Sequence, residues 1–306
     1  MAYVPKAEGE VLLIGLGAQK AASTWLWEQL AAHPDVHLQL PKEHHYWDVV
    51  RTPFNWAFSV IAEVRRARTE RARGIFRLRE FWSAEARAER ARLVAYEGLF
   101  TGDVNDHGRY LAYLSFSREG QRVVGDITPE YALLTRETYA EILAVHPDVR
   151  FVYILRDPVD RLWSGVRFRL RHLVERGVMA REGLLEAFKR ALEGPEQLDN
   201  RYSRYDLTIQ ALEAAVPRER ILYLFYETMF EPSEIARVEA FLGLEGIATS
   251  DERVNTQERM LDLPDGLAAR AAASLSECYD FCGRRFGDAV PAAWHMPRLK
   301  DTGPAA

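Results

Sequence analysis

The sequence predicts an α/β protein with a parallel sheet of about five strands, covered by helices on both faces. Apolar β runs alternate along the chain with segments of helical periodicity. These runs span residues 11–16, 36–40, 122–127, 149–155 and 220–226. The fourth run is almost continuously apolar, which is typical of a strand buried on both faces of a parallel sheet. A loop of small residues follows the first run, as in the phosphate sites of α/β proteins.

The loop after the first run, residues 17–24, carries the first chemical signal. It has the sequence G-A-Q-K-A-A-S-T and leads into a helix with apolar residues at helical spacing. In such a turn the backbone N–H groups and the helix N-terminus point towards an anion. Lys20 adds a positive charge, and Ser23 and Thr24 add hydroxyl donors. The alternative is an ordinary strand-to-helix turn with a solvated lysine.

The spacing in this loop differs from that of a nucleotide triphosphatase, in which Lys directly precedes the Ser or Thr that holds magnesium. Lys20 stands three residues before Ser23, and the chain has no Gly-Lys-Ser/Thr triplet. The loop resembles instead the 5′-phosphosulfate loop of the sulfotransferases, roughly G-x-x-K-[ST]-G-[ST]-T-x-L, within a P-loop-like sheet. The matching residues are Gly17, Lys20, Ser23, Thr24 and Leu26. Ala22 replaces a Gly, which stiffens the backbone there.

A second polar cluster follows the run at 36–40. Residues 41–48 have the sequence P-K-E-H-H-Y-W-D, at the sheet edge where α/β proteins place chemistry. This segment resembles the K-E-x-H-F-F-D element of heparan-type sulfotransferases at Lys42, Glu43, His45 and Asp48. The resemblance implies that Glu43 is the general base, with His45 as a reserve base or a donor to a sulfuryl oxygen. A polar loop over an aromatic cluster is the alternative.

Residues 49–120 carry no long β run. Arginines crowd residues 65–79, and Ala, Glu and Arg dominate residues 80–92, which is typical of helices. We expect one domain, 1–306, with a mostly helical insertion that forms a wall or lid for the acceptor. The arginines either steer an anionic ligand or belong to a solvated face paired by glutamates.

The third β run leads into T-P-E-Y at residues 128–131, which resembles the family's E-K-[ST]-P-x-Y element. Asp126 stands in place of Glu, and Ile127 replaces a Lys that helps at the active site in some heparan enzymes. Asp126 either orients a catalytic group or the acceptor, or caps the next helix.

The fourth run ends in R-D-P-V-D-R-L-W-S at residues 156–164. Pro158 is placed to open a helix, with Asp157 as its cap, and Ser164 lies about two turns into it. A guanidinium and a hydroxyl so placed can grip a second phosphate. The segment matches R-D-P-x-x-R-x-x-S, the 3′-phosphate signature of sulfotransferases. The alternative for Arg156 is a structural salt bridge.

The C-terminal part predicts helices, a connection and one closing loop. The helices span residues 133–145, 205–215, 232–244 and 267–286, the third with Gly243 as its C-cap. Residues 174–199 predict a mobile, charged connection. The family closes a loop over the nucleotide near residues 255–264, where Arg259 is the candidate contact.

The resemblance implies a bacterial sulfotransferase that uses 3′-phosphoadenosine 5′-phosphosulfate (PAPS) and releases the bisphosphate PAP, without a metal. The acceptor is then a small molecule or glycan, with a carbohydrate or secondary metabolite favoured. Trp25 matches an adenine-stacking Trp of the family, or belongs to the core. The expected catalytic residues are Lys20, Glu43, His45 and Asp126. The expected nucleotide-binding residues are Gly17, Gln19, Lys20, Ala21, Ala22, Ser23, Thr24, Trp25, Arg156 and Ser164.

Composition and charge limit the partners and the cellular location that we expect for this protein. A net charge of −5 over 306 residues argues against non-specific nucleic-acid binding. No apolar run approaches the ~20 residues of a membrane span, and the N-terminus lacks an apolar signal region. Two cysteines, Cys278 and Cys282, are too few for a disulfide framework or a zinc site. We therefore expect a cytoplasmic protein, with a homodimer as an open option.

Two other functions stay open. A P-loop-type small-molecule kinase requires the Gly-Lys-Ser/Thr loop that this chain lacks. A non-catalytic nucleotide-binding protein would have no use for both Lys20 and Glu43.

Overall fold

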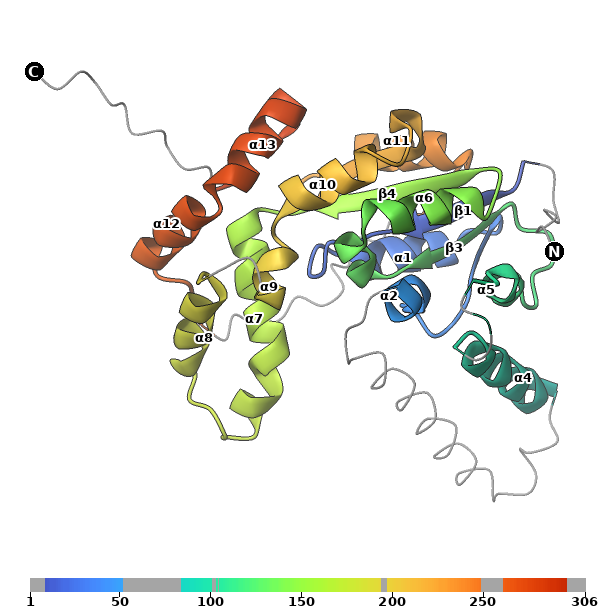
Figure 1. Ribbon diagram of the computed structural model, residues 1–306, viewed down its shortest axis with the longest axis horizontal. Helices are drawn as coiled ribbons and strands as arrows, with labels where there is room; N and C mark the ends of the chain where they lie inside the picture. The colour runs from blue at the N-terminus through green and yellow to red at the C-terminus, as the bar shows by residue number, and fades with distance from the viewer. Residues whose placement is uncertain are drawn as a thin grey trace, which may run out of the picture.

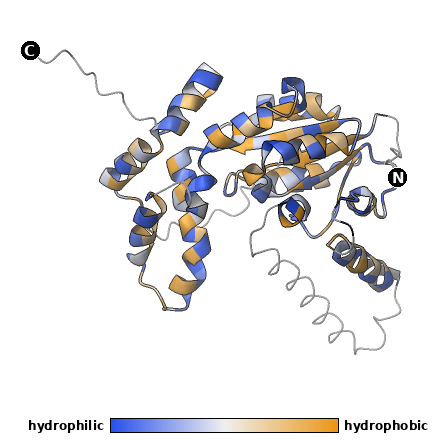
Figure 2. Cartoon of the chain, in the orientation of Figure 1, coloured by the Kyte–Doolittle hydropathy of each residue, from blue (hydrophilic) through white to orange (hydrophobic). Residues whose placement is uncertain are grey.

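The computed structural model describes residues 9–51, 84–100, 103, 105–193, 197–248 and 261–295. It confirms the predicted fold class, a five-stranded sheet in which all paired strands are parallel, in the order β2-β3-β1-β4-β5. Figure 1 shows this sheet with helices packed around it. The strands are β1 (Val11–Gly15), β2 (Val36–Leu38), β3 (Val123–Ile127), β4 (Val149–Leu155) and β5 (Ile221–Phe225). Most residues of the strands are apolar (Figure 2), and β1, β3 and β5 are buried throughout.

Helices flank the sheet, and the described ones are bounded as follows. The first half of the chain forms α1 (Ser23–Ala31), α2 (Tyr46–Arg51), α4 (Ala84–Gly98), α5 (Gly108–Leu114), the 3₁₀ turn η1 (Pro129–Leu133), α6 (Arg136–Ala144) and α7 (Pro158–Glu175). The second half forms α8 (Gly183–Ala191), α9 (Leu198–Arg201), α10 (Tyr205–Glu213), η2 (Arg218–Arg220), α11 (Pro232–Leu242), α12 (Asp265–Ser274), α13 (Ser276–Phe286) and η3 (Gly287–Ala289). None of these is long and apolar enough to cross a membrane.

Because the strands are parallel, the loops after β1, β2, β3 and β4 leave the same edge of the sheet. Gly17 shows how tightly two of them pack. Its φ is +90°, and a Cβ there would lie 2.8 Å from the Cα of Pro129. Glycine is therefore required at this position on both conformational and steric grounds. The register thus brings the first loop against the T-P-E-Y segment.

Several helix predictions need correction. The connection predicted at 174–199 is wrong, because α8 forms there and buries Phe188 against Trp163, with ring centroids 5.4 Å apart. The helix predicted at 267–286 is two helices, α12 and α13, which meet at the buried Leu275. The helix predicted at 133–145 begins only at Arg136, because Thr135 caps it. The predicted C-cap is confirmed, since Gly243 has a φ of +69°.

The described part of the insertion is mostly helical, in α4 and α5. Helices α4 and α5 contact each other, and α5 contacts β3 (Figure 1). Aromatic side chains connect them to α2, with Tyr110 stacked on Tyr46 at 4.5 Å and Tyr96 tilted against Tyr113 at 5.4 Å. Residues 52–83, which include the crowded arginines, and residues 249–260, which include Arg259, lie outside the described residues.

A buried ionic cluster joins three segments at the opposite edge of the sheet, where β1, β3 and β4 begin. The Glu10 carboxylate lies 2.5 Å from Arg118 Nη1 and 3.2 Å from His146 Nε2, and none of the three side chains is exposed. A buried charge that loses its partner is strongly destabilising, because the remaining charge keeps its desolvation penalty.

We therefore expect Glu10→Gln to lower the free energy of unfolding by about 3–5 kcal/mol. Urea unfolding followed by circular dichroism measures this change. The matched control is Glu186→Gln on α8, whose carboxylate pairs with Lys189 at the surface, and its urea midpoint should not move. Equal midpoints for the two variants would show that the cluster does not stabilise the fold.

Candidate active site

Backbone strain is concentrated in the two loops that the sequence selects as the site. Among the described residues, five non-glycine residues have positive φ, and four of them are in these loops. They are Lys20 (70°), Ala22 (64°), Glu43 (65°) and His45 (56°). Such conformations cost of order 1–3 kcal/mol each and persist where surrounding structure enforces them, often at functional sites.

The first loop is fixed by backbone pairing and by two arginines. Ala18 N donates to Ile154 O at 2.7 Å, which extends the pairing of β1 with β4. Arg156 Nη1 donates to Lys20 O at 2.9 Å, and Arg161 Nε donates to the carbonyl of Gln19 at 3.0 Å. The structure thus brings Lys20 and Arg156 together, as the sequence predicts.

Arg161 is a residue that the sequence analysis did not select. Its side chain is fully buried and its cation lies 5.1 Å from the ring centroid of Tyr202. A second guanidinium nitrogen donates to Gln19 Oε1 at 3.3 Å, so Arg161 holds both the backbone and the side chain of that residue. In the sequence, Arg161 is the second arginine of the R-D-P-x-x-R pattern, and this position could have identified it.

Positive charge surrounds Lys20. Its Nζ lies 4.1 Å from the ring centroid of Phe168 on α7. Burial and the charges of four cations together lower the pKa of Lys20 to about 8; the cations are Arg156, Arg161, Arg167 and Arg171. Like charges so close repel one another, and an anion placed among them would relieve that repulsion.

The start of α7 holds the second predicted phosphate site. Asp157 caps this helix, as predicted, and accepts from Val159 N at 2.9 Å and Asp160 N at 3.0 Å. Ser164 is on the same helix and is 6 % exposed. Arg156 lies over the ring of Tyr226 at 4.6 Å, and its buried Nε has no hydrogen-bond partner among the described residues. An anion bound here would give that N–H a partner.

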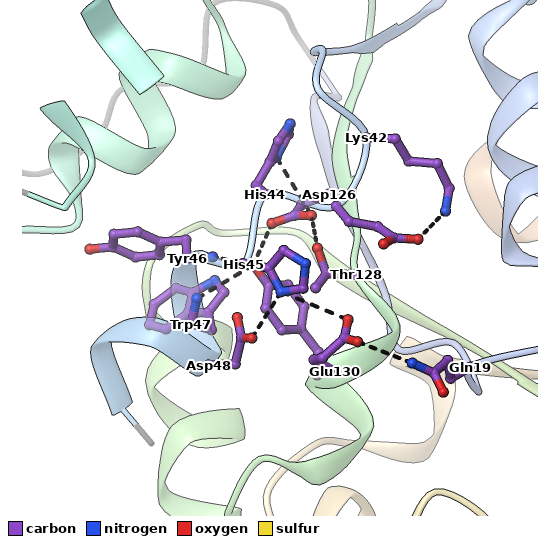
Figure 3. Close-up of polar contacts among 12 residues, drawn as sticks. Gln19, Lys42, His44, His45, Tyr46, Trp47, Asp48, Asp126, Thr128 and Glu130 are labelled. Atoms are coloured by element: carbon purple, nitrogen blue, oxygen red, sulfur yellow. Dashed lines mark hydrogen bonds and ion pairs between the residues drawn. The ribbon is translucent and has the colours of Figure 1, made fainter. Parts of the chain in front are cut away.

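The second loop forms the other side of the site (Figure 3). Glu43 lies 2.5 Å from Lys42 Nζ, and His45 Nδ1 lies 3.0 Å from Asp48 Oδ2. Burial lowers the pKa of His45, but the hydrogen bond to Asp48 and the charges of Glu130, Asp48 and Glu43 raise it, to a net value of about 9. His45 is therefore protonated at neutral pH, where it donates a hydrogen bond rather than accepting a proton.

Asp126 is buried beneath this loop and contacts other side chains. It accepts from Tyr131 OH at 2.5 Å, Thr128 Oγ1 at 2.7 Å and Tyr110 OH at 3.0 Å, and lies 3.5 Å from His44 Nδ1. Burial raises its pKa, but His44 and the hydroxyl donors lower it further, to about 2. The N-cap residue of the next turn, η1, is Thr128, and no side chain accepts a capping hydrogen bond there. These contacts favour the orienting role over the capping role.

Trp25 is 2 % exposed and packs edge-on against Phe230, with ring centroids 4.9 Å apart. This packing agrees with the core interpretation, since the buried indole presents almost no surface on which adenine could stack. Ser23 is likewise buried at the start of α1.

Glu130 connects the two sides of the site, and the sequence analysis did not select it. Its Oε1 accepts from Gln19 Nε2 at 3.5 Å and from Tyr202 OH at 3.4 Å, while Oε2 lies 3.8 Å from His45 Nδ1 (Figure 3). Burial and the charges of Glu43 and Asp48 raise the pKa of Glu130, although His45 opposes them. In the sequence, the one indication of a role for Glu130 is that a carboxylate stands at the variable position of T-P-x-Y.

Two groups of described side chains have the spacing of metal ligands. Glu43, His45 and Glu130 bring one ligand atom each within 4.8 Å of one another. A metal ion bound to this set would have to displace the proton that His45 holds at neutral pH, because a ligating imidazole is neutral. The second group, Asp157, Asp160 and His295, includes the helix cap described above.

The fold is that of a P-loop-like α/β protein, and the two segments that the sequence predicts to bind anions meet at one sheet edge. A model of the sulfotransferase family matches residues 13–248, and the chain belongs to this family. It is accordingly a sulfotransferase, an enzyme of the transferase class.

Comparison with solved structures supports the fold. The crystal structure of a sulfotransferase from Alicyclobacillus acidocaldarius has a TM-score of 0.57 and 19 % identity, and the match covers 92 % of this chain and 96 % of that one. The sulfotransferase domain of the Synechococcus PCC 7002 olefin synthase is a more distant match. It has a TM-score of 0.47 and 18 % identity, covering 89 % of this chain and 90 % of the domain. No curated protein matches the sequence.

Proposed function

We propose that the protein transfers the sulfuryl group of PAPS to a hydroxyl or amine of an acceptor and releases PAP. The observation that carries this proposal is the contact between Arg156 Nη1 and Lys20 O at 2.9 Å. This contact joins the first loop to the residue after β4, which supports a single ligand whose two separated phosphates span both segments. A bound anion would relieve the repulsion around Lys20 and would give Arg156 Nε a hydrogen-bond partner. Both effects support an anionic donor.

The donor side follows from the first loop and α7. The N–H groups of the first loop bind the 5′-phosphate together with the hydroxyls of Ser23 and Thr24. The N–H groups of Ala18 and Ala21 are excepted, because they donate to backbone carbonyls. Arg156 and Ser164 bind the 3′-phosphate. PAPS supplies the activated sulfuryl group, whose bond to the 5′-phosphate breaks with charge developing on the bridging oxygen. Lys20 donates to that oxygen and stabilises the charge without a metal.

On the acceptor side, Glu43 takes the proton of the acceptor in line with the leaving phosphate. His45 is already protonated and donates to a sulfuryl oxygen. Asp126 acts as a positioning residue, because it holds the hydroxyl of Tyr131, and that oxygen accepts from Tyr46 N at 3.0 Å. This chain of contacts fixes the start of α2 directly after His45.

We further propose a cytoplasmic enzyme with a small-molecule or glycan acceptor, such as a carbohydrate or a secondary metabolite, and with the insertion as the acceptor wall. Calorimetry with PAP, followed by transfer of labelled sulfate with magnesium chelated, tests the proposal. Binding and transfer under these conditions are expected. Transfer that needs magnesium would favour the kinase alternative, and PAP binding without transfer to any acceptor class would favour a non-catalytic protein.

PAP binding should depend on pH through Lys20. In the free protein its pKa is about 8, and a bound anion stabilises the ammonium form and raises that pKa. Above pH 8 the protein must therefore take up a proton to bind PAP. Affinity should fall with rising pH, at most about tenfold per pH unit, until the pH reaches the pKa of the complex.

Calorimetry at pH 9 in two buffers of different ionisation enthalpy measures this proton uptake, expected to approach one proton per PAP. Lys20→Met should abolish it and is the matched control. Equal apparent enthalpies in the two buffers for the unmodified protein would contradict the proposed contact between Lys20 and PAP.

A further inference from the structure

We propose that Glu130 makes the acceptor side of the site select molecules that are neutral or positively charged beside their reacting group, and reject anionic ones. This inference rests on the proposed sulfuryl transfer and names the acceptor class. It is carried by the position of Glu130 between the two loops and by the charges around it.

The site is electrically divided. The donor side holds Lys20 together with Arg156, Arg167 and Arg171, as an anionic donor requires. The acceptor side holds the carboxylates of Glu43, Asp48 and Glu130 around His45. An acceptor that approaches opposite the leaving phosphate therefore enters a region of the opposite sign.

With His45 protonated and Glu43, Asp48 and Glu130 ionised, the pairing on the acceptor side leaves one negative charge in excess. Glu43 lies 2.5 Å from Lys42, and Asp48 lies 3.0 Å from the His45 nitrogen. The hydrogen-bond donors to Glu130 in the described chain are the neutral groups of Gln19 and Tyr202. Among the described residues, the cation within 4 Å of Glu130 is His45, at 3.8 Å, which also pairs with Asp48.

The sequence of residues 126–131 also makes the acceptor side more negative than the family motif would. The motif E-K-[ST]-P-x-Y places a lysine where this chain has Ile127, which is 2 % exposed and apolar. The variable position of the same motif carries Glu130. Relative to a motif with a neutral residue there, the segment loses one positive and gains one negative charge. The heparan-like pattern at 42–48 thus occurs without the charge that would favour a polyanionic acceptor.

Glu130 can act on a ligand through its field. Its side chain is 12 % exposed, so water and salt screen its charge less than they screen a surface carboxylate. For unit charges about 6 Å apart at an effective dielectric constant of about 20, the interaction changes affinity by roughly tenfold to a hundredfold.

A set of three phenols that differ only in side-chain charge tests the proposal. Tyramine is cationic, 4-propylphenol is neutral and 3-(4-hydroxyphenyl)propionate is anionic. Their dissociation constants for the PAP-saturated protein and their rates of sulfation are measured at low salt. We expect the propionate to bind at least about tenfold more weakly than tyramine, with propylphenol between them.

Variants assign the effect to Glu130. Glu130→Gln keeps hydrogen-bonding oxygen and nitrogen atoms near Gln19 and Tyr202 and should reduce the ratio between tyramine and propionate about tenfold. Glu130→Lys should reverse the order. Glu213→Gln changes the net charge by the same amount at a distant site, where Glu213 pairs with Arg285, and should leave the ratio unchanged.

Affinity for PAP and the urea midpoint serve as fold controls for both Glu130 variants. A wild-type protein that does not bind tyramine more tightly than the propionate overturns the inference, and so does a ratio that Glu130→Gln leaves unchanged. Failure to bind PAP would instead reject the proposed function. PAP binding with the opposite ranking of the phenols rejects only the acceptor class.

Discussion

Replacement of Lys20 with alanine is expected to lower the rate of sulfuryl transfer by roughly 10²–10³-fold. The side chain extends from a loop held by Arg156 and Arg161, so its ammonium group is positioned before the donor binds. Fixed donors of this kind act most strongly where charge develops, in this case on the bridging oxygen as the sulfur–oxygen bond breaks. Single-turnover transfer from labelled PAPS measures the loss directly.

The expected pattern is a large change in the transfer rate with a smaller change in the dissociation constant of PAP, which lacks the sulfuryl group. Lys189→Ala is the control, because Lys189 lies at the surface of α8 paired with Glu186. A Lys20→Ala protein that transfers sulfate at the wild-type rate would remove Lys20 from the chemistry, whatever its part in binding.

Glu43→Gln is expected to reduce turnover by roughly 10²–10⁴-fold, the usual contribution of a general base. His45 cannot replace it at neutral pH, because the pKa of His45 is raised to about 9 and its nitrogen is already protonated. The amide introduced by this substitution keeps the size of the side chain while removing its ability to take a proton. Steady-state rates from pH 6 to 8 measure the effect.

The comparison with His45→Asn separates the two candidate bases. Replacing the charged imidazolium by a neutral amide should reduce the rate less than loss of the base, and Glu186→Gln on α8 should have no effect. If Glu43→Gln retained activity while His45→Asn abolished it, the roles assigned to these two residues would have to be exchanged.

Local sequence was enough for the parts of the site that depend on backbone conformation. The first loop is marked by small residues between an apolar run and a helix, and the structure confirms a strand, a strained turn and α1 in that order. The Asp157 cap of α7 and the Gly243 cap of α11 were predicted in the same way, because capping involves residues a few positions apart.

Helix boundaries were less predictable where burial decides them. The charged, glycine-containing stretch before residue 200 suggests a connection, yet α8 forms there, with Leu184 and Phe188 buried and the Phe188 ring packed against Trp163 of α7. The Ala-rich C-terminal segment suggested one helix, yet the chain turns at Leu275, which is buried. Both outcomes depend on neighbours that are distant in sequence.

The sequence by itself determined the fold class and the alternation of strands and helices, and it predicts the residues of two anion-binding segments. The tertiary structure alone decided the strand order, the contact of Arg156 with Lys20, the protonation of His45, and the places of Arg161 and Glu130. The physical reason is the distance along the sequence over which each interaction acts. Turns, caps and periodic burial are set by residues within a few positions, whereas the charge on a side chain and the partner it reaches depend on how separate strands are brought to one edge of the sheet.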